Sequence, residues 1–111
     1  MPLYQIKIVI QKYKIDEFVD SLRTLVSGFR KEKGCLDYCL YQDFDKEHAF
    51  CIVAEWETGE AMQKHFLTQK FEVLIGAARV LGETFDMIMA EVLESEDFEL
   101  SVKIAEHNTT S

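Results

Sequence analysis

The sequence predicts one α+β domain in which helices pack on a small sheet, and three observations support this fold class. Residues 3–10 alternate between apolar and polar side chains, as a half-buried strand does. Residues 15–30 instead repeat their apolar side chains every three or four positions, which is the period of an amphipathic helix. Two further apolar runs, 35–44 and 49–56, are separated by the short polar segment DKEH, which suits a hairpin connection.

The first strand and the first helix each have a distinct apolar face. On the strand, the residues expected to share the buried face are Tyr4, Ile6, Ile8 and Ile10. The helix is expected to run from Ile15 to Arg30 and to be stopped by Gly34, after the basic segment RKEK.

The second half of the chain repeats this order. The run Ala49–Trp56 is apolar on both faces at positions 51–54, so it should lie centrally in the sheet. Thr58 is suited to cap a following helix on which His65 falls on the apolar face. A further short, well-buried helix is expected around 71–79, and a last strand after Gly82.

The predicted order is therefore strand, helix, strand, strand, helix, strand, which is the split βαβ or ferredoxin-like arrangement. Its helices cover only one face of the sheet, yet the central strand is apolar on both. An apolar patch of that size needs a cover, and a second copy of the chain supplies one economically. We therefore expect a homodimer formed sheet against sheet.

Composition restricts the partners and the compartment. The 111 residues carry a formal net charge of −8, which disfavours nucleic acid and anionic membranes as partners, because binding to phosphates relies on Lys and Arg. No apolar run is long enough to span a bilayer, and the N-terminus lacks a signal-peptide pattern. Three cysteines without a CxxC pair indicate core thiols and no metal site. These features predict a soluble, cytoplasmic protein with its domain at 1–94 and a partly disordered acidic extension at 95–111.

Residues 34–74, GCLDYCLYQDFDKEHAFCIVAEWETGEAMQKHFLTQKFEVL, resemble the antibiotic biosynthesis monooxygenase family of dimeric α+β barrels. The residues that carry the resemblance are the strand start at 34–41, the corner EWETGEA at 55–61, and His65 followed six positions later by Phe71. The resemblance implies a ferredoxin-like subunit whose pocket, between sheet and helices, takes a small or flat organic substrate.

For this chain the resemblance implies a monooxygenase that uses molecular oxygen and no cofactor, acting on a quinol-like or other small aromatic substrate. His65 would be the catalytic base, since the pKa of a histidine suits that task, and Trp56 would line the site and donate its indole N–H to a developing oxyanion. The residues expected to form the substrate pocket are Tyr41, Met62, Phe66, Phe71 and Met87.

Other interpretations remain open. His65 could be a buried histidine with a backbone or Glu partner, packed beside Met62 and Phe66. Ile52 and Met62 stand where similar oxygenases carry polar residues, which favours a binding domain of the same fold without turnover. Isomerisation of a small polar metabolite is a third interpretation, and it would need more polar pocket groups. Heme degradation is disfavoured, because His65 and Ile75 stand where that branch carries a tryptophan and an iron-binding histidine.

Overall fold

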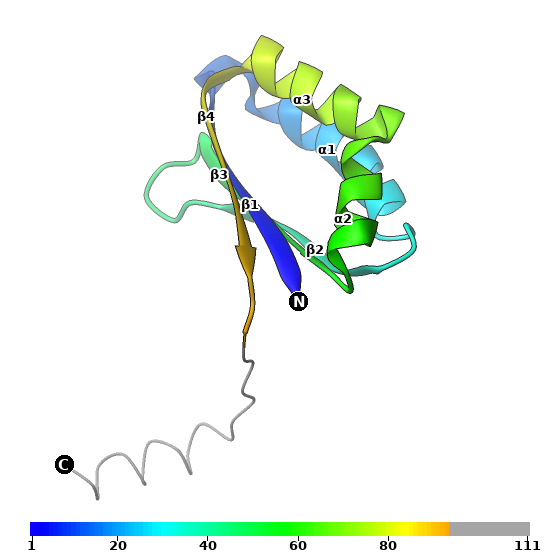
Figure 1. The fold of residues 1–111 in the computed structure, drawn as a ribbon. Helices are drawn as coiled ribbons and strands as arrows, with labels where there is room; N and C mark the ends of the chain where they lie inside the picture. The colour runs from blue at the N-terminus through cyan, green and yellow to red at the C-terminus, as the bar shows by residue number, and fades with distance from the viewer. Residues whose placement is uncertain (94–111) are drawn as a thin grey trace, which may run out of the picture.

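A computed structural model describes residues 1–93, which form a four-stranded sheet with three α-helices on one of its faces (Figure 1). In chain order the elements are β1 (Pro2–Ile10), a 3₁₀ turn (Lys12–Lys14), α1 (Ile15–Phe29), β2 (Cys35–Gln42), β3 (Ala49–Trp56), α2 (Gly59–Phe66), α3 (Gln69–Leu81) and β4 (Gly82–Glu91). The predicted boundary at residue 94 and the predicted acidic extension 95–111 lie outside the described residues.

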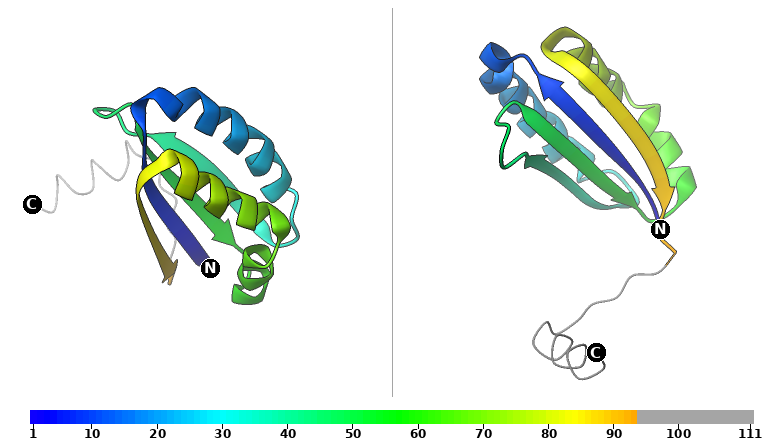
Figure 2. Two further views of the ribbon diagram at one scale, coloured as in Figure 1. Left: turned by 90° about the horizontal axis from the view of Figure 1, so that it is seen from above. Right: turned by 90° about the vertical axis from the view of Figure 1, so that its left-hand side faces the viewer.

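The sheet has the strand order β2-β3-β1-β4, and every neighbouring pair is antiparallel. This is the predicted ferredoxin-like arrangement, with β1 and β3 in the centre. The right-hand view of Figure 2 shows the four strands from the side that carries no helix, with the helices behind them. The predicted central position of the second hairpin strand is therefore confirmed.

The predicted alternation on β1 is also confirmed. Its four even-numbered residues from Tyr4 to Ile10 are buried, whereas Lys7 between them is exposed. They face the helices and join one core cluster with the buried residues of α1, which are Phe18, Leu22, Leu25, Val26 and Phe29. Because a strand alternates its side chains and a helix repeats every 3.6 residues, these two patterns meet in one apolar core between sheet and helices.

α1 ends at Phe29, one residue before its predicted end at Arg30, so Gly34, five residues further on, is not the residue that stops the helix, contrary to the prediction. Gly34 instead makes the turn into β2 with a positive φ of 87°, a conformation that favours glycine. A Cβ at this position would lie 2.5 Å from the Cβ of Ala61 on α2. The glycine is therefore required where the α1–β2 connection passes close to the next helix.

The helix predicted at 71–79 is longer and less buried than expected. It begins after Thr68, whose hydroxyl accepts a hydrogen bond from the backbone N–H of Phe71, and it continues to Leu81. Val73 and Val80 lie on its outer face and are 51% and 72% exposed. The apolar residues of α3 thus exceed what its inner face can bury, which the periodicity of a short segment does not reveal.

The other face of the sheet has no helical cover within residues 1–93. Its central residues come from the odd-numbered positions of β1 and β3, among them Val9, Cys51 and Val53, and all three are partly exposed. In this same part of the chain, none of the helices combines the length and the apolar character that crossing a membrane requires.

Candidate active site

His65 lies on the inner face of α2, in the aromatic part of the core. Thr58 begins this helix by accepting a hydrogen bond from the backbone N–H of Ala61, as predicted, so that Met62 and His65 both turn inward. The side chain of His65 is 0% exposed. The aromatic rings around it are those of Trp56, Phe29, Phe71, Tyr4, Phe66 and Tyr38, with ring centroids between 4.5 and 6.0 Å from that of the imidazole.

Both ring nitrogens of His65 have hydrogen-bond partners. Nδ1 lies 3.0 Å from the carboxylate oxygen Oε1 of Glu32, and Nε2 lies 2.7 Å from the hydroxyl oxygen of Tyr4. The hydroxyl oxygen of Tyr4 in turn lies 2.7 Å from that of Tyr38. The four side chains form one continuous chain of hydrogen bonds inside the core.

The register of the sheet brings the two tyrosines together. Ala54 on β3 pairs with Tyr4 on one side and with Tyr38 on the other, so the three residues form one row on the helix-covered face. Because the alanine in the middle is small, the two phenol rings can approach each other above it. Their centroids are 6.0 Å apart in an edge-to-face arrangement, with the hydroxyls in contact.

Glu32 reaches the site from the connection between α1 and β2. Its backbone N–H donates to the carbonyl of Phe29, and the carbonyl of Gly34 accepts a hydrogen bond from Glu57 at the β3–α2 corner. These contacts hold the connection beside α2. The Glu32 side chain remains 22% exposed, so one end of the hydrogen-bond chain is at the protein surface.

Burial controls the protonation of this cluster. It lowers the pKa of His65 from its ordinary value of 6.5, while the hydrogen bond and the charge of Glu32 act in the opposite direction. Burial also raises the pKa values of Tyr4 and Tyr38 well above the usual range of a phenol. At neutral pH the site therefore holds a neutral imidazole beside two neutral hydroxyls.

Trp56 ends β3 within this cluster and is fully buried. Its ring packs at 4.5 Å from the imidazole, and its Nε1 has no hydrogen-bond partner among the described residues. A buried N–H without a partner costs roughly 1–3 kcal/mol, so this donor has the capacity to bind an oxygen atom that enters the cluster.

The structure brings most of the predicted pocket residues to this side of the sheet. Phe66 and Phe71 pack on both Tyr4 and His65, and Met62 is buried in the same core. Met87 on β4 is partly buried and pairs with Ile6, which lies two residues after Tyr4 on the same face of β1.

Tyr41 does not belong to this group. It pairs with Cys51 on the sheet face that has no helices, and it is 55% exposed. Because strand side chains alternate, Tyr38 and Tyr41, three positions apart, must point to opposite faces. Tyr38 therefore occupies the place in the site that had been expected for Tyr41.

Aromatic side chains of residues 1–93 enclose the His65 ring, so the open cavity expected beside it is not found there. A separate apolar pocket of about 290 Å³ lies between α3 and β4, lined by Ile75, Ala78, Arg79 and Phe85. Phe71, which packs on His65, lies near the start of α3, whereas this pocket lies along the second half of the helix.

Three members of the hydrogen-bond chain were not among the residues predicted for the site. Tyr4 and Tyr38 fit the apolar pattern of their strands, and their only distinguishing signal is a hydroxyl that needs a partner when buried. Glu32 lies in the charged run RKEK and has no local signal. Among residues 1–93, no group of three or more His, Cys, Asp or Glu side chains is arranged to hold a metal ion.

Comparison with known proteins places these features in context. Residues 3–77 match the family model described as antibiotic biosynthesis monooxygenase. A Bacillus subtilis relative named putative monooxygenase YcnE is 26% identical over 95 residues, which cover 85% of this chain and 100% of the relative.

Two solved structures share the fold. One is of a putative antibiotic biosynthesis monooxygenase from Deinococcus radiodurans, with 20% identity, a TM-score of 0.83 and coverage of 88% of this chain and 98% of its own. The other is of SnoaB from Streptomyces nogalater, described as a cofactor-independent oxygenase, with 16% identity, a TM-score of 0.75 and coverage of 85% and 94%.

Proposed function

The chain belongs to the antibiotic biosynthesis monooxygenase family, and on that premise we propose that it is a cofactor-independent monooxygenase acting on a small quinol-like aromatic substrate. The description of SnoaB as a cofactor-independent oxygenase supports the reaction class. The observation that carries the proposal is the neutral imidazole of His65, which is hydrogen-bonded at both nitrogens and surrounded by aromatic rings.

The reaction requires little from the protein beyond a base and a dry site. Loss of a hydroxyl proton gives a phenolate, whose electron-rich ring carbon passes two electrons to O₂ and forms a carbon–peroxide bond. The peroxide takes up a proton, and loss of water together with the ring hydrogen leaves a carbonyl. One oxygen atom stays on the substrate and the other leaves as water, so O₂ is the oxidant and the substrate supplies the electrons.

His65 is the base in this proposal. A neutral imidazole can accept a proton, and the carboxylate of Glu32 at 3.0 Å stabilises the imidazolium that results. The unpartnered Nε1 of Trp56 is the donor for the negative oxygen that develops on the substrate.

A substrate reaches the imidazole when the aromatic rings that enclose it move aside. Phe71 packs on His65 and on Phe66, and both phenylalanines belong to the aromatic cluster around the imidazole. Rotation of Phe71, with Phe66 beside it, would exchange one aromatic ring for another next to the imidazole.

Oxygen consumption tests the proposal. The purified protein, treated with a metal chelator, is expected to consume oxygen with members of a panel of benzo- and naphthohydroquinones. The His65→Gln variant should lose roughly a hundredfold or more in kcat, the size of a general-base contribution. The matched control is His48→Gln, in the β2–β3 turn, and it should leave the rate unchanged. Equal rates in both variants would remove His65 from the mechanism.

A binding protein without turnover is the second candidate. The complete enclosure of His65 and the apolar side chains of Ile52 and Met62 on the same side of the sheet favour it. Hydroquinones that raise the melting temperature of the protein without any oxygen consumption would support this alternative against the monooxygenase.

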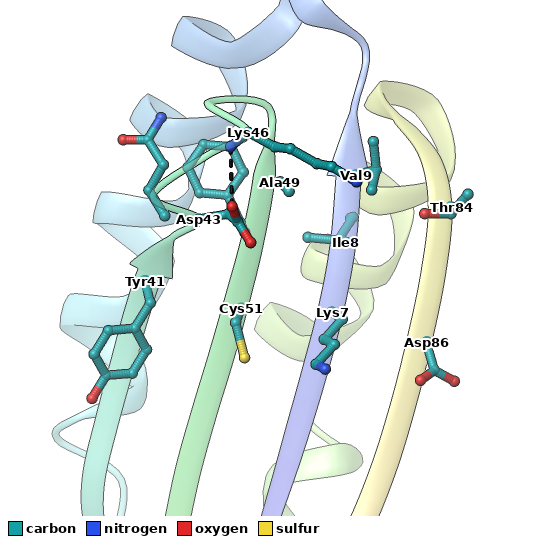
Figure 3. A pocket seen from close by; sticks show the side chains of 12 residues that line it. Lys7, Ile8, Val9, Tyr41, Asp43, Lys46, Ala49, Cys51, Thr84 and Asp86 are labelled. Atoms are coloured by element: carbon teal, nitrogen blue, oxygen red, sulfur yellow. Dashed lines mark hydrogen bonds between the residues drawn. The ribbon is translucent and has the colours of Figure 1, made fainter.

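We further propose that the protein is a homodimer joined through the sheet face without helices. Such a dimer would form the α+β barrel expected for the family. Figure 3 shows Tyr41, Cys51, Lys7 and Asp86 side by side on this face, one from each strand, at a shallow pocket of about 310 Å³. The partly exposed Val9 and Val53 on the same face favour an apolar cover. The free thiols of Cys35, Cys39 and Cys51 support the cytoplasm as the compartment.

A further inference from the structure

His65 is closed to direct proton transfer from a substrate. Nδ1 contacts Glu32, and Nε2 contacts the hydroxyl of Tyr4 at 2.7 Å, so both ring nitrogens are occupied. A substrate hydroxyl could reach a ring nitrogen only by displacing one of these partners. If His65 is the base, its neighbours must carry the proton to it.

The hydrogen-bond chain has one proton arrangement when His65 is neutral. The carboxylate of Glu32 can only accept, so Nδ1 carries the ring hydrogen and Nε2 presents a lone pair. Tyr4 must then donate its hydroxyl hydrogen to Nε2. Since Tyr4 has no second hydrogen to give, the hydroxyl of Tyr38 must donate to Tyr4 across their 2.7 Å contact.

The arrangement is reversed when His65 is an imidazolium. Both ring nitrogens then donate, Nδ1 to Glu32 and Nε2 to the oxygen of Tyr4, and Tyr4 donates to Tyr38. The two arrangements differ by one proton at His65 and by the direction of both hydroxyl hydrogen bonds. No heavy atom needs to move between them.

We propose that Tyr38 and Tyr4 are a proton relay in which Tyr38 accepts the proton of the bound substrate hydroxyl. As that proton reaches the oxygen of Tyr38, the hydrogen of Tyr38 passes to Tyr4 and the hydrogen of Tyr4 passes to Nε2 of His65. The substrate becomes an anion, His65 becomes a cation paired with Glu32, and both tyrosines end neutral. This relay rests on the proposed function and adds the residue that touches the substrate.

Unused hydrogen-bonding capacity favours Tyr38 as the contact of the substrate hydroxyl, although Tyr38 is itself fully buried and the rings of the cluster must move to admit a substrate. Among the described residues, the hydroxyl of Tyr4 contacts both Tyr38 and His65, whereas the hydroxyl of Tyr38 contacts Tyr4 alone. The other open position in the cluster is Nε1 of Trp56. Tyr38 and Trp56 both pack on the imidazole, with centroids 6.0 and 4.5 Å from it, so both open positions border the same ring.

Burial suits the tyrosines to this role. Removal from water raises the pKa of Tyr4 and of Tyr38, so a tyrosinate is disfavoured and the hydroxyls pass a proton on instead of storing a charge. Phe29 packs at 5.0 Å on the ring of Tyr38, and Nε of Arg30 donates to the Tyr38 carbonyl at 3.0 Å. These contacts fix Tyr38 at the edge of the cluster.

The relay is tested by removing one hydroxyl at a time. The variants Tyr38→Phe and Tyr4→Phe keep the ring and delete the oxygen, and Tyr41→Phe is the control because it lies on the same strand but faces away. With naphthohydroquinone as the probe, both relay variants are expected to lose roughly a hundredfold in kcat, as His65→Gln does, and Tyr41→Phe none. Unchanged kcat in Tyr38→Phe or in Tyr4→Phe, with His65→Gln inactive, would overturn the relay and leave the proposed function intact.

Two measurements report on the relay apart from the size of the rate. In mixtures of light and heavy water, kcat of the wild-type protein should show a curved proton inventory, since more than one hydrogen moves. A straight line would overturn the relay.

In nitrogen NMR spectra of the His65 ring, Tyr38→Phe should change the chemical shift of Nε2 although Tyr38 does not touch that atom, because Tyr4 loses its donor. An Nε2 that carries the hydrogen in the neutral protein would also overturn it. A wild-type protein inactive with every hydroquinone overturns the proposed function and the relay's role with it.

Discussion

The carboxylate of Glu32 lies 3.0 Å from Nδ1 of His65, although the whole β2–β3 hairpin separates the two residues in the chain. Glu32 comes from the connection before the hairpin and His65 from the helix after it. Their contact fixes which ring nitrogen carries the hydrogen, and so leaves Nε2 as the basic atom toward Tyr4.

Replacing Glu32 by Gln should lower the pKa of His65 further. The charge and the hydrogen bond of Glu32 both raise that pKa against the effect of burial, and an amide retains only a neutral acceptor. The pKa is measured by following the ring C–H signals of His65 in proton NMR spectra over a pH series. Glu60→Gln is the control, since Glu60 pairs with Lys64 at the surface. A pKa unchanged or raised in Glu32→Gln would contradict the assignment.

The free energy of unfolding should fall as the pH drops below about 6.5, the ordinary histidine pKa. Burial lowers the folded-state pKa of His65, so the unfolded chain binds the proton first and the stabilising contribution is lost as pH falls toward the folded value. The groups facing the ring are Glu32 from the α1–β2 connection, Tyr4 from β1 and Tyr38 from β2.

Urea unfolding of the wild type and of His65→Gln, compared from about pH 8 to about pH 5, isolates this contribution. On the acid side the wild type should lose stability more steeply than His65→Gln, and the two slopes should differ by at most about 1.4 kcal/mol per pH unit. Parallel curves would show that the folded and unfolded states bind this proton equally.

Gly34→Ala should destabilise the protein by more than about 2 kcal/mol. The positive φ of 87° disfavours a side chain, and the new Cβ would lie 2.5 Å from the Cβ of Ala61. Gly76→Ala is the matched control inside α3, where a Cβ meets no atom within 4 Å, and it should stabilise by about 0.5–1 kcal/mol. Both are measured by urea unfolding, and a neutral Gly34→Ala would contradict the close approach of this turn to α2.

Val53→Asp should dissociate the proposed homodimer. Val53 lies on the central strand β3 and faces the side of the sheet without helices, where a buried carboxylate would meet a second copy. Sedimentation at micromolar concentration should show a dimer for the wild type and a monomer for the variant. Val73→Asp, on the exposed face of α3, is the control and should remain a dimer. A monomeric wild type would exclude the proposed assembly.

The elements of the fold were accessible from local patterns. The alternation on β1 and the capping position of Thr58 each concern neighbouring residues, and each matches the structure. The end of α1 was predicted to within one residue, but the role of Gly34 was misassigned, because what requires a glycine there is its close approach to Ala61, which is distant in sequence. A local pattern indicates where a glycine lies but not which long-range contact requires it.

The residues of the candidate site also differ in whether a local pattern could identify them. His65 and Trp56 could be singled out because the corner between β3 and α2 is one continuous segment. Tyr38 and Tyr41 were not distinguished correctly, since both occur in an apolar strand and only the pairing of β2 with β3 fixes which one faces the helices.

The sequence by itself therefore determined the order of the elements, the inward faces of β1 and α2 and the presence of a histidine in the core, because these follow from side-chain periods of two and 3.6 residues. Only the tertiary structure decided that this histidine meets Tyr4, Tyr38 and Glu32. Those residues come from three other segments, and it is strand register and the close passage of the α1–β2 connection, not local propensity, that bring their polar atoms within hydrogen-bonding distance.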